Sequence, residues 1–261
     1  QRLRAMASTA EVLRHRDVAA LDPAERARLA ALIGRLRWQH PRRRTPRQRP
    51  SRRGRVDAGR TLRASLRRLG EPTEIRHRRR GQRPRRVVLL IDVSGSMGPY
   101  ADALLRVAHR IVSVPGRAGA GRVEAFTLGT RLTCVTRALR LRDPDRALVA
   151  AGETVPDWSG GTRLGETLRA FLNRHGSLAR GAVVVVFSDG WERGDAVLLG
   201  EQAARLGRLA HRLVWVNPHR GKDGYQPLQR GVVAVLPSVD DFLAGHSLAT
   251  YEELMGVVAG A

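Results

Sequence analysis

The stretch Val87-Val88-Leu89-Leu90-Ile91-Asp92-Val93-Ser94-Gly95-Ser96 decides the fold of this chain. Residues 87–91 form a continuous apolar run, which is typical of a strand buried on both faces of a parallel sheet. The run leads into an aspartate, and two serines follow at alternate positions. In open parallel sheets, ligands bind beyond the carboxyl ends of the strands. The stretch therefore predicts a central strand that ends in a polar site.

The residues after this strand alternate between helical and extended patterns. Alternation of this kind predicts an α/β fold of three layers, Rossmann-like, with a mostly parallel central sheet and helices on both faces. Two of the strands are close enough to form a hairpin around Gly129-Thr130. The predicted strands are 122–128, 132–136, 182–187, 213–216 and 239–242, and the predicted helices are 99–114, 144–151, 163–173, 196–210 and 252–258.

The chain up to residue 86 has a different composition. It holds 27 arginines and 7 acids, a balance of +20, whereas residues 87–261 have a balance of only +3. Within it, Asp22 and Pro23 predict the start of a helix, as N-cap and first helical residue. We expect residues 1–85 to be a basic helical and Arg/Pro-rich segment, and residues 86–261 to be the domain.

Three parts of this basic segment have distinct patterns. Residues 39–60 combine proline and glycine with many arginines, which predicts an extended, solvated linker. Residues 61–70 predict a short basic helix with Leu62, Leu66 and Leu69 on one face. Residues 76–86 are a further basic run.

The charge of this segment suggests an acidic partner for it alone: nucleic acid, anionic lipid or an acidic protein. Residues 41–86 contain no Phe, Tyr or Trp, and aromatic side chains are what single-strand stacking uses. A solvated linker or docking on an acidic protein is therefore favoured over specific nucleic-acid recognition.

Cys134 is the only cysteine. It excludes an intramolecular disulfide, which fits a reducing compartment, and its place in a predicted strand indicates a buried apolar residue. No apolar run approaches the ~20 residues that cross a bilayer. We expect a cytoplasmic protein with no membrane span.

Polar residues follow two of the apolar strands. Residues 182–187 lead into Ser188-Asp189-Gly190, as residues 87–91 lead into Asp92, and between them Trp158-Ser159-Gly160-Gly161-Thr162 precedes a helix. We expect all three segments on one rim of the sheet. Asp92, Ser94 and Ser96 alternate, so an extended loop directs three oxygens to one point, and Gly95 lets the turn close. Carboxylates and hydroxyls form a hard-oxygen site suited to Mg²⁺ or Mn²⁺.

The simpler interpretation is a polar strand-to-helix turn in which Ser94 or Ser96 caps the next helix. Trp158 and Trp191 beside these loops fit either a partner-facing patch or packing. Arg193-Gly194-Asp195 spells an adhesion tripeptide, but Asp195 is a better helix N-cap. The eight histidines are scattered, and we expect none to be a metal ligand.

The ordered set Asp-x-Ser-x-Ser, Thr and Ser-Asp-Gly resembles the metal-ion-dependent adhesion site of von Willebrand factor A (VWA) domains. The resemblance implies a metal site formed by Asp92, Ser94, Ser96, Thr162 and Asp189. It implies Mg²⁺ first, with Mn²⁺ or Ca²⁺ as alternatives, and an open position for an acidic residue of a partner.

Longer stretches are similar to the bacterial CoxE-like subgroup, over roughly residues 60–255. They are TLRASLRRLGEP from Thr61, DVSGSMGPYADALLR from Asp92, DWSGGTRLGETLRAF from Asp157, SDGWERGD from Ser188 and HRLVWVNP from His211. The resemblance implies an accessory or assembly factor that works like a chaperone with a MoxR-type AAA+ ATPase. Its client would be a metalloenzyme, as for the member that assists maturation of the molybdenum–copper centre of carbon monoxide dehydrogenase.

Catalytic patterns are missing. Ser94 stands where a haloacid-dehalogenase phosphatase needs a second acid, and neither a Gly-x-Ser-x-Gly elbow nor a Walker loop occurs. We therefore predict a binding protein, not an enzyme. The alternative hypothesis is a basic nucleic-acid-associated protein whose metal site is structural.

Overall fold

The computed structural model describes residues 11–71, 74–114, 123–155, 162–221 and 224–261. The chain divides into two compact units. The larger contains the described residues up to Pro41 together with Arg85–Ala261, and the smaller is Arg42–Pro84.

The larger unit is built on a six-stranded sheet with the strand order β6-β5-β4-β7-β8-β9. All neighbouring strands are parallel except β5 and β6, which form the predicted antiparallel hairpin. The mostly parallel sheet that we predicted is thus confirmed. The strands are β4 (Val87–Asp92), β5 (Val123–Leu128), β6 (Leu132–Cys134), β7 (Val183–Phe187), β8 (Arg212–Asn217) and β9 (Asp241–Ala244).

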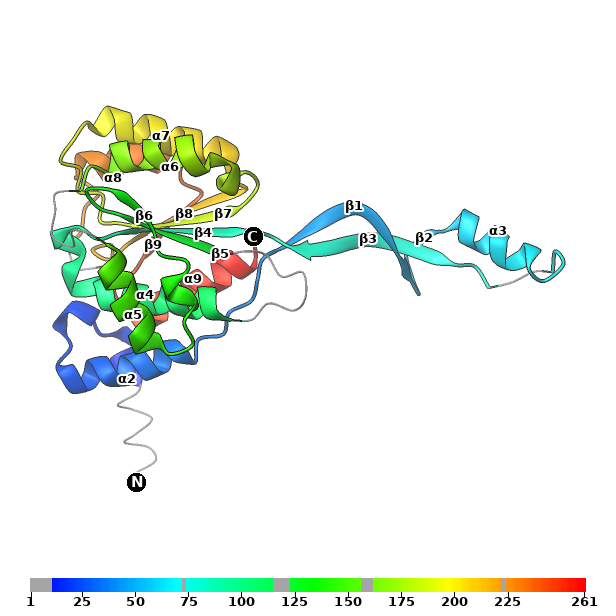
Figure 1. Ribbon diagram of the computed structural model, residues 1–261, viewed down its shortest axis with the longest axis horizontal. Coiled ribbons are helices and arrows are strands. Elements are labelled where there is room, and N and C mark those ends of the chain that lie inside the picture. The colour runs from blue at the N-terminus through cyan, green and yellow to red at the C-terminus, as the bar shows by residue number, and fades with distance from the viewer. Residues whose placement is uncertain (1–10, 72–73, 115–122, 156–161, 222–223) are drawn as a thin grey trace, which may run out of the picture. The chain divides into compact units, whose positions relative to one another are not determined.

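Helices cover both faces of this sheet (Figure 1), which confirms the three-layer architecture. One face carries α6 (Leu164–Ala179), α7 (Ala196–Leu209) and α8 (Arg230–Val235). The other carries α4 (Gly98–Ser113), α5 (Pro144–Thr154) and α9 (Leu248–Ala259), and α2 (Pro23–Gly34) packs against α4 and α9.

The central strand β4 is fully buried because its side chains alternate between these two layers. Val88 and Leu90 pack with the first group of helices, and Leu89 and Ile91 pack with the second. This alternation explains why the strand is apolar at every position instead of every second one.

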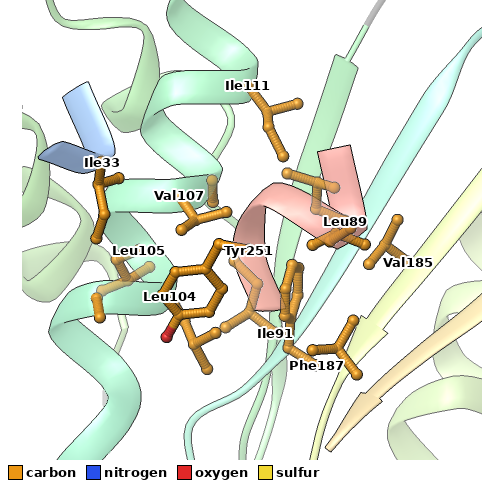
Figure 2. Close-up of a cluster of buried hydrophobic side chains, with 14 of the residues drawn as sticks. Ile33, Leu89, Ile91, Leu104, Leu105, Val107, Ile111, Val185, Phe187 and Tyr251 are labelled. Carbon is orange, nitrogen blue, oxygen red and sulfur yellow. The ribbon is translucent and has the colours of Figure 1, made fainter. Parts of the chain in front are cut away.

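The helix α2 belongs to the domain core. Figure 2 shows Ile33 of α2 in the buried cluster that includes Leu104 of α4 and Tyr251 of α9. Asp22 caps α2 as predicted, since its carboxylate accepts a hydrogen bond of 2.8 Å from the backbone N–H of Glu25. The observed division has a break between residues 84 and 85, one residue from the predicted boundary. It differs in that the described residues up to Pro41 belong to the larger unit, because their leucines and isoleucine are buried in its core.

The smaller unit is a three-stranded antiparallel sheet with one short helix, which stands between the second and third strands in the sequence. Its strand order is β1-β3-β2, with β1 (Arg42–Ser51), β2 (Arg55–Val56) and β3 (His77–Pro84). The prediction of an extended linker over residues 39–60 was wrong, because backbone pairing with β3 orders β1 without apolar side chains. The basic helix is α3 (Ala58–Leu66), which begins earlier than predicted at the N-cap Asp57.

Cys134 is exposed, so the prediction of a buried cysteine was wrong. It ends β6, an edge strand that pairs only with β5, and the edge leaves its side chain uncovered. Within the described residues, no helix combines the length and the apolar character needed to cross a membrane.

Candidate metal centre

The two aspartates of the predicted site lie on neighbouring strands. Asp92 is the last residue of β4, and Asp189 follows the end of β7 by two residues. Because β4 and β7 are paired in parallel, both acids lie at the same carboxyl edge of the sheet, as predicted. Both are buried, with 0% and 2% of their surfaces exposed.

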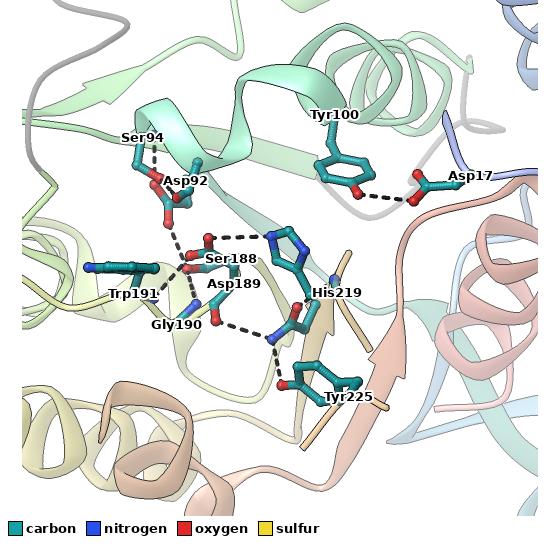
Figure 3. A network of polar contacts seen from close by, with 12 residues as sticks. Asp17, Asp92, Ser94, Tyr100, Ser188, Asp189, Gly190, Trp191, His219 and Tyr225 are labelled. Carbon is teal, nitrogen blue, oxygen red and sulfur yellow. Dashed lines mark hydrogen bonds and ion pairs between the residues drawn. The ribbon is translucent and has the colours of Figure 1, made fainter. Parts of the chain in front are cut away.

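Hydrogen bonds hold the carboxylate of Asp92 in one orientation (Figure 3). Its Oδ1 accepts from the backbone N–H of Ser94 at 2.8 Å, and its Oδ2 accepts from the hydroxyl of Ser188 at 2.7 Å. The same hydroxyl oxygen accepts from the backbone N–H of Gly190 at 3.0 Å. These contacts tie the loop after β4 to the loop after β7.

The electrostatic environment of Asp92 disfavours its negative charge. Burial raises its pKa to about 6, the hydrogen bonds from Ser188 and Ser94 offset this only in part, and the nearby Asp189 raises it further. A buried carboxylate in this state is stabilised by a cation placed beside it.

Asp189 behaves in the opposite way. Burial raises its pKa, but hydrogen bonds from His219, Ser96 and the backbone of Trp191 outweigh burial, so its pKa lies below the usual range. Its Oδ1 accepts from the N–H of Trp191 at 3.0 Å, and its Oδ2 lies 3.7 Å from His219 Nε2. Asp189 is therefore the acid of the pair that keeps its charge.

The two serines do not act as helix caps. The short 3-10 helix Gly95–Met97 and α4 both begin without a side-chain capping hydrogen bond, so the capping interpretation of Ser94 and Ser96 is wrong. Their hydroxyl oxygens lie 3.1 Å apart. This separation is close to the ~3 Å between adjacent ligand oxygens of an octahedral ion with bonds of ~2.1 Å.

Gly95 between them is not needed for the turn. Its φ is not in the left-handed region, and an added Cβ would meet open space. Gly190 is the glycine that the site requires. It has a φ of 73°, and a Cβ there would come within 2.5 Å of Val232 Cγ2 on α8.

Thr162 is buried, and its hydroxyl oxygen has no hydrogen-bond partner among the described residues. It lies just before α6, where the backbone N–H of Gly165 donates to Glu192 Oε2 at 2.8 Å. That contact joins the start of α6 to the loop after β7, which carries Asp189. An unpaired buried hydroxyl destabilises the fold by about 1–3 kcal/mol, so a ligand that binds the Thr162 hydroxyl would relieve this destabilisation.

The structure thus brings four predicted residues together by direct interactions, namely Asp92, Ser94, Ser96 and Asp189. Thr162 is linked to this group only indirectly, through the bond from Gly165 at the start of α6 to Glu192 in the loop that carries Asp189. The preceding residues 158–161 lie outside the described residues.

The donor set fits a hard divalent ion. Two carboxylates and three hydroxyls supply only oxygen atoms, which Mg²⁺ and Mn²⁺ prefer. No three His, Cys, Asp or Glu side chains gather in the described part of the chain to hold a metal. A metal here therefore depends on the hydroxyls of Ser94, Ser96 and Thr162 as much as on the two acids.

Three residues around the site were missed from the sequence. Ser188 holds Asp92, His219 faces Asp189, and Asn217 donates to the backbone oxygen of Asp189 at 3.2 Å. Asn217 ends β8 and His219 follows it closely. Ligands bind beyond the carboxyl ends of parallel strands. Applying this rule to the predicted strand 213–216 as well would have found Asn217 and His219.

Burial and capping bear on two nearby residues. Trp191 is 61% exposed, so it is not packed in the core. Asp195 caps α7 by accepting a hydrogen bond of 2.8 Å from the N–H of Val197, as predicted.

Comparison with known proteins gives a family match over most of the chain. A family described as VWA domain containing CoxE-like protein matches residues 26–251. No curated protein sequence is significantly similar to the chain.

Several solved structures are similar in fold at low sequence identity. The proximal thread matrix protein 1 from the mussel byssus, with a zinc-occupied MIDAS motif, is 15% identical with a TM-score of 0.44, over 67% of this chain and 47% of that one. The ArnB paralog VWA2 from Sulfolobus acidocaldarius is 14% identical with a TM-score of 0.43, over 67% of this chain and 44% of its own length. The SpRpn10 VWA domain is 13% identical with a TM-score of 0.38, over 68% and 97% of the two chains. The chain thus spans about half the length of the first two proteins.

Proposed function

Because the chain belongs to the family of CoxE-like proteins that contain a VWA domain, we propose that it is a metal-dependent protein-interaction module and not an enzyme. Asp92, Ser94, Ser96, Thr162 and Asp189 hold a divalent ion, Mg²⁺ in the first place. The partner is a MoxR-type AAA+ ATPase, the client is a metalloenzyme that the two proteins help to mature, and the location is the cytoplasm.

The observation that carries this proposal is the buried hydroxyl of Thr162, which has no hydrogen-bond partner among the described residues and stands just before α6. Ser94 and Ser96 lie at the same edge as the two acids and cap no helix. Their hydroxyls hydrogen-bond each other, and Ser96 also hydrogen-bonds Asp189, so both hydroxyls gather beside the two acids. A buried oxygen without a partner, such as that of Thr162, is suited to a ligand from outside.

The charge balance supports an acidic partner. Two aspartates only balance the charge of a dication, so one more carboxylate oxygen can be accepted. When bound, the ion supplies a positive charge for that oxygen. The residues of this chain orient the site: Ser188 fixes Asp92, and His219 and the N–H of Trp191 fix Asp189.

The test is metal-dependent binding of the purified MoxR-type ATPase from the same organism. We expect the complex to form with Mg²⁺, to dissociate with EDTA and to form again when Mg²⁺ is restored. Asp92→Asn should abolish binding, whereas Asp195→Asn, which alters an acid that only caps α7, should leave it unchanged.

Two outcomes would contradict the proposal. If the ATPase binds equally with and without metal, the ion plays no part in docking. If calorimetry finds no Mg²⁺ or Mn²⁺ binding by the folded wild-type chain, the metal site itself is wrong.

A further inference from the structure

The described residues of the smaller unit, Arg42–Pro84, form no apolar core. None of its large hydrophobic residues is buried, and five are exposed: Val56, Leu62, Leu66, Leu69 and Ile75. The unit also contains 17 arginines but only 3 acids. Exposed apolar groups gathered in one small unit mark an interaction site more often than chance exposure.

The helix α3 separates apolar from basic side chains. Leu62 and Leu66 are four residues apart, so they lie along one side of the helix, and Leu69 lies in the turn that follows the helix. Arg60, Arg63 and Arg67 lie on another side. The apolar side faces no other side chain closely enough to be covered, since Leu62 and Leu66 are 60% and 64% exposed.

Leu69 has two unfavourable features, a strained backbone and an exposed apolar side chain. Its φ is 56°, in the left-handed region where the helix end normally has glycine, and its side chain is 99% exposed. The turn itself is formed by the backbone, since the N–H of Gly70 donates to the carbonyl of Ser65 at 3.1 Å. A glycine at position 69 would make this turn without strain, so the leucine side chain points to a contact outside the chain.

The strands of this unit carry unbalanced positive charge. Arg43 lies directly opposite Arg83, and Arg49 opposite Arg79, and such like-charge pairs destabilise a sheet. Among the described residues, no carboxylate forms an ion pair with an arginine of β1, β2 or β3. An external anion would relieve this repulsion.

We propose that the smaller unit binds the surface of an anionic phospholipid membrane. Leu62, Leu66 and Leu69 enter the boundary between head groups and acyl chains, and the arginines bind lipid phosphates. Because no described helix can cross a membrane, the contact is peripheral. It does not depend on the proposed metal site.

A lipid surface fits these features better than the other polyanions. Nucleic acid offers phosphates but no apolar medium for the leucines, and the unit has no aromatic side chain to stack on bases. Protein interfaces draw most of their energy from Trp, Tyr and Arg anchors, and this unit has the arginines but neither Trp nor Tyr. A unit with only aliphatic apolar groups and a large excess of positive charge suits an extended anionic layer.

The test is flotation of the full chain with vesicles of phosphatidylcholine mixed with phosphatidylglycerol, and with vesicles of phosphatidylcholine alone. We expect binding to the mixed vesicles only, weakened by salt. Replacing Leu62, Leu66 and Leu69 together by Gln should lower the partition coefficient roughly tenfold or more. The matched control replaces three exposed apolar residues of the larger unit, Val149, Val197 and Leu228, by Gln and should bind like wild type.

A single substitution separates a binding role from a structural one. Leu69→Gly removes the strain and the side chain together, so it should leave thermal stability equal or higher while it lowers vesicle binding. The proposal is overturned if the triple leucine variant binds mixed vesicles as well as wild type, or if no binding to them is seen. Preferential binding of a random-sequence DNA duplex in competition with the vesicles would likewise overturn it, in favour of a nucleic-acid surface.

Discussion

Ser188 donates a hydrogen bond of 2.7 Å to Asp92, although 96 residues separate them in the sequence. Ser188 directly follows β7 and Asp92 ends β4, and the two strands are neighbours in the sheet. The bond therefore depends on the assembled sheet. It fixes one oxygen of the buried acid on which the proposed metal site depends.

We expect Ser188→Ala to raise the pKa of Asp92, because the hydroxyl hydrogen bond lowers it in the native site. Loss of this bond should also weaken Mg²⁺ binding by about tenfold, as for other residues that orient metal ligands. Calorimetric titration measures the affinity, and carboxyl NMR measures the pKa. Ser177→Ala alters an exposed serine far along α6 and serves as the control; equal losses in both variants would contradict the prediction.

The metal-free protein should lose stability as the pH rises from about 4 to about 6. The folded pKa of Asp92 is about 6, above its ordinary value of 3.8, so the folded state binds more protons than the unfolded state within this window. The loss is of the order of 3 kcal/mol at most. Thermal melts against pH check it, and Asp92→Asn should flatten the profile. Saturating Mg²⁺ should restore stability above pH 6, since an ion favours the carboxylate.

Thr162→Val should weaken divalent-ion binding with little effect on stability, because it removes a hydroxyl that makes no hydrogen bond to any described residue. Thr127→Val is the matched control. Thr127 on β5 is also buried with an unpartnered hydroxyl, but it was not predicted to be a ligand. Calorimetry on both variants should show a loss only for Thr162, and equal affinities for the two would remove Thr162 from the site.

Gly190→Ala should destabilise the fold by about 1–3 kcal/mol and weaken metal binding. The new Cβ would strain a residue at positive φ and press against Val232, which displaces the loop that carries Asp189. Gly95→Ala adds a Cβ in open space at an ordinary φ, and it should leave the unfolding free energy unchanged. Denaturant unfolding of the two variants gives the comparison.

Ile33→Ala should destabilise the larger unit by about 2–5 kcal/mol, because Ile33 is fully buried beside α4. A helix in a detached basic segment would tolerate the change. Leu62→Ala on α3 removes an exposed side chain and should have no measurable effect on thermal unfolding. A negligible effect of Ile33→Ala would contradict the assignment of α2 to the core of the larger unit.

The sequence alone determined the main sheet and two of the site's loops. Apolar runs at residues 87–91 and 182–187 predict strands buried on both faces, because only such strands lack a polar alternation. The acids that follow them predict a shared rim, since parallel neighbouring strands end at the same edge. The pattern of Asp92, Ser94 and Ser96 could be recognised because all three lie within one short loop.

Only the tertiary structure decided the features that depend on distant segments. Residues 42–51 have no apolar pattern, so nothing local distinguishes a paired strand from a solvated linker until β3 supplies its hydrogen bonds. The exposure of Cys134 follows from its place on an edge strand, which is a property of the sheet order. Ser188 and His219 act on Asp92 and Asp189 because parallel pairing brings the ends of three strands together. Short-range patterns identify the apolar strands of the larger unit, but the strand order decides which polar side chains meet.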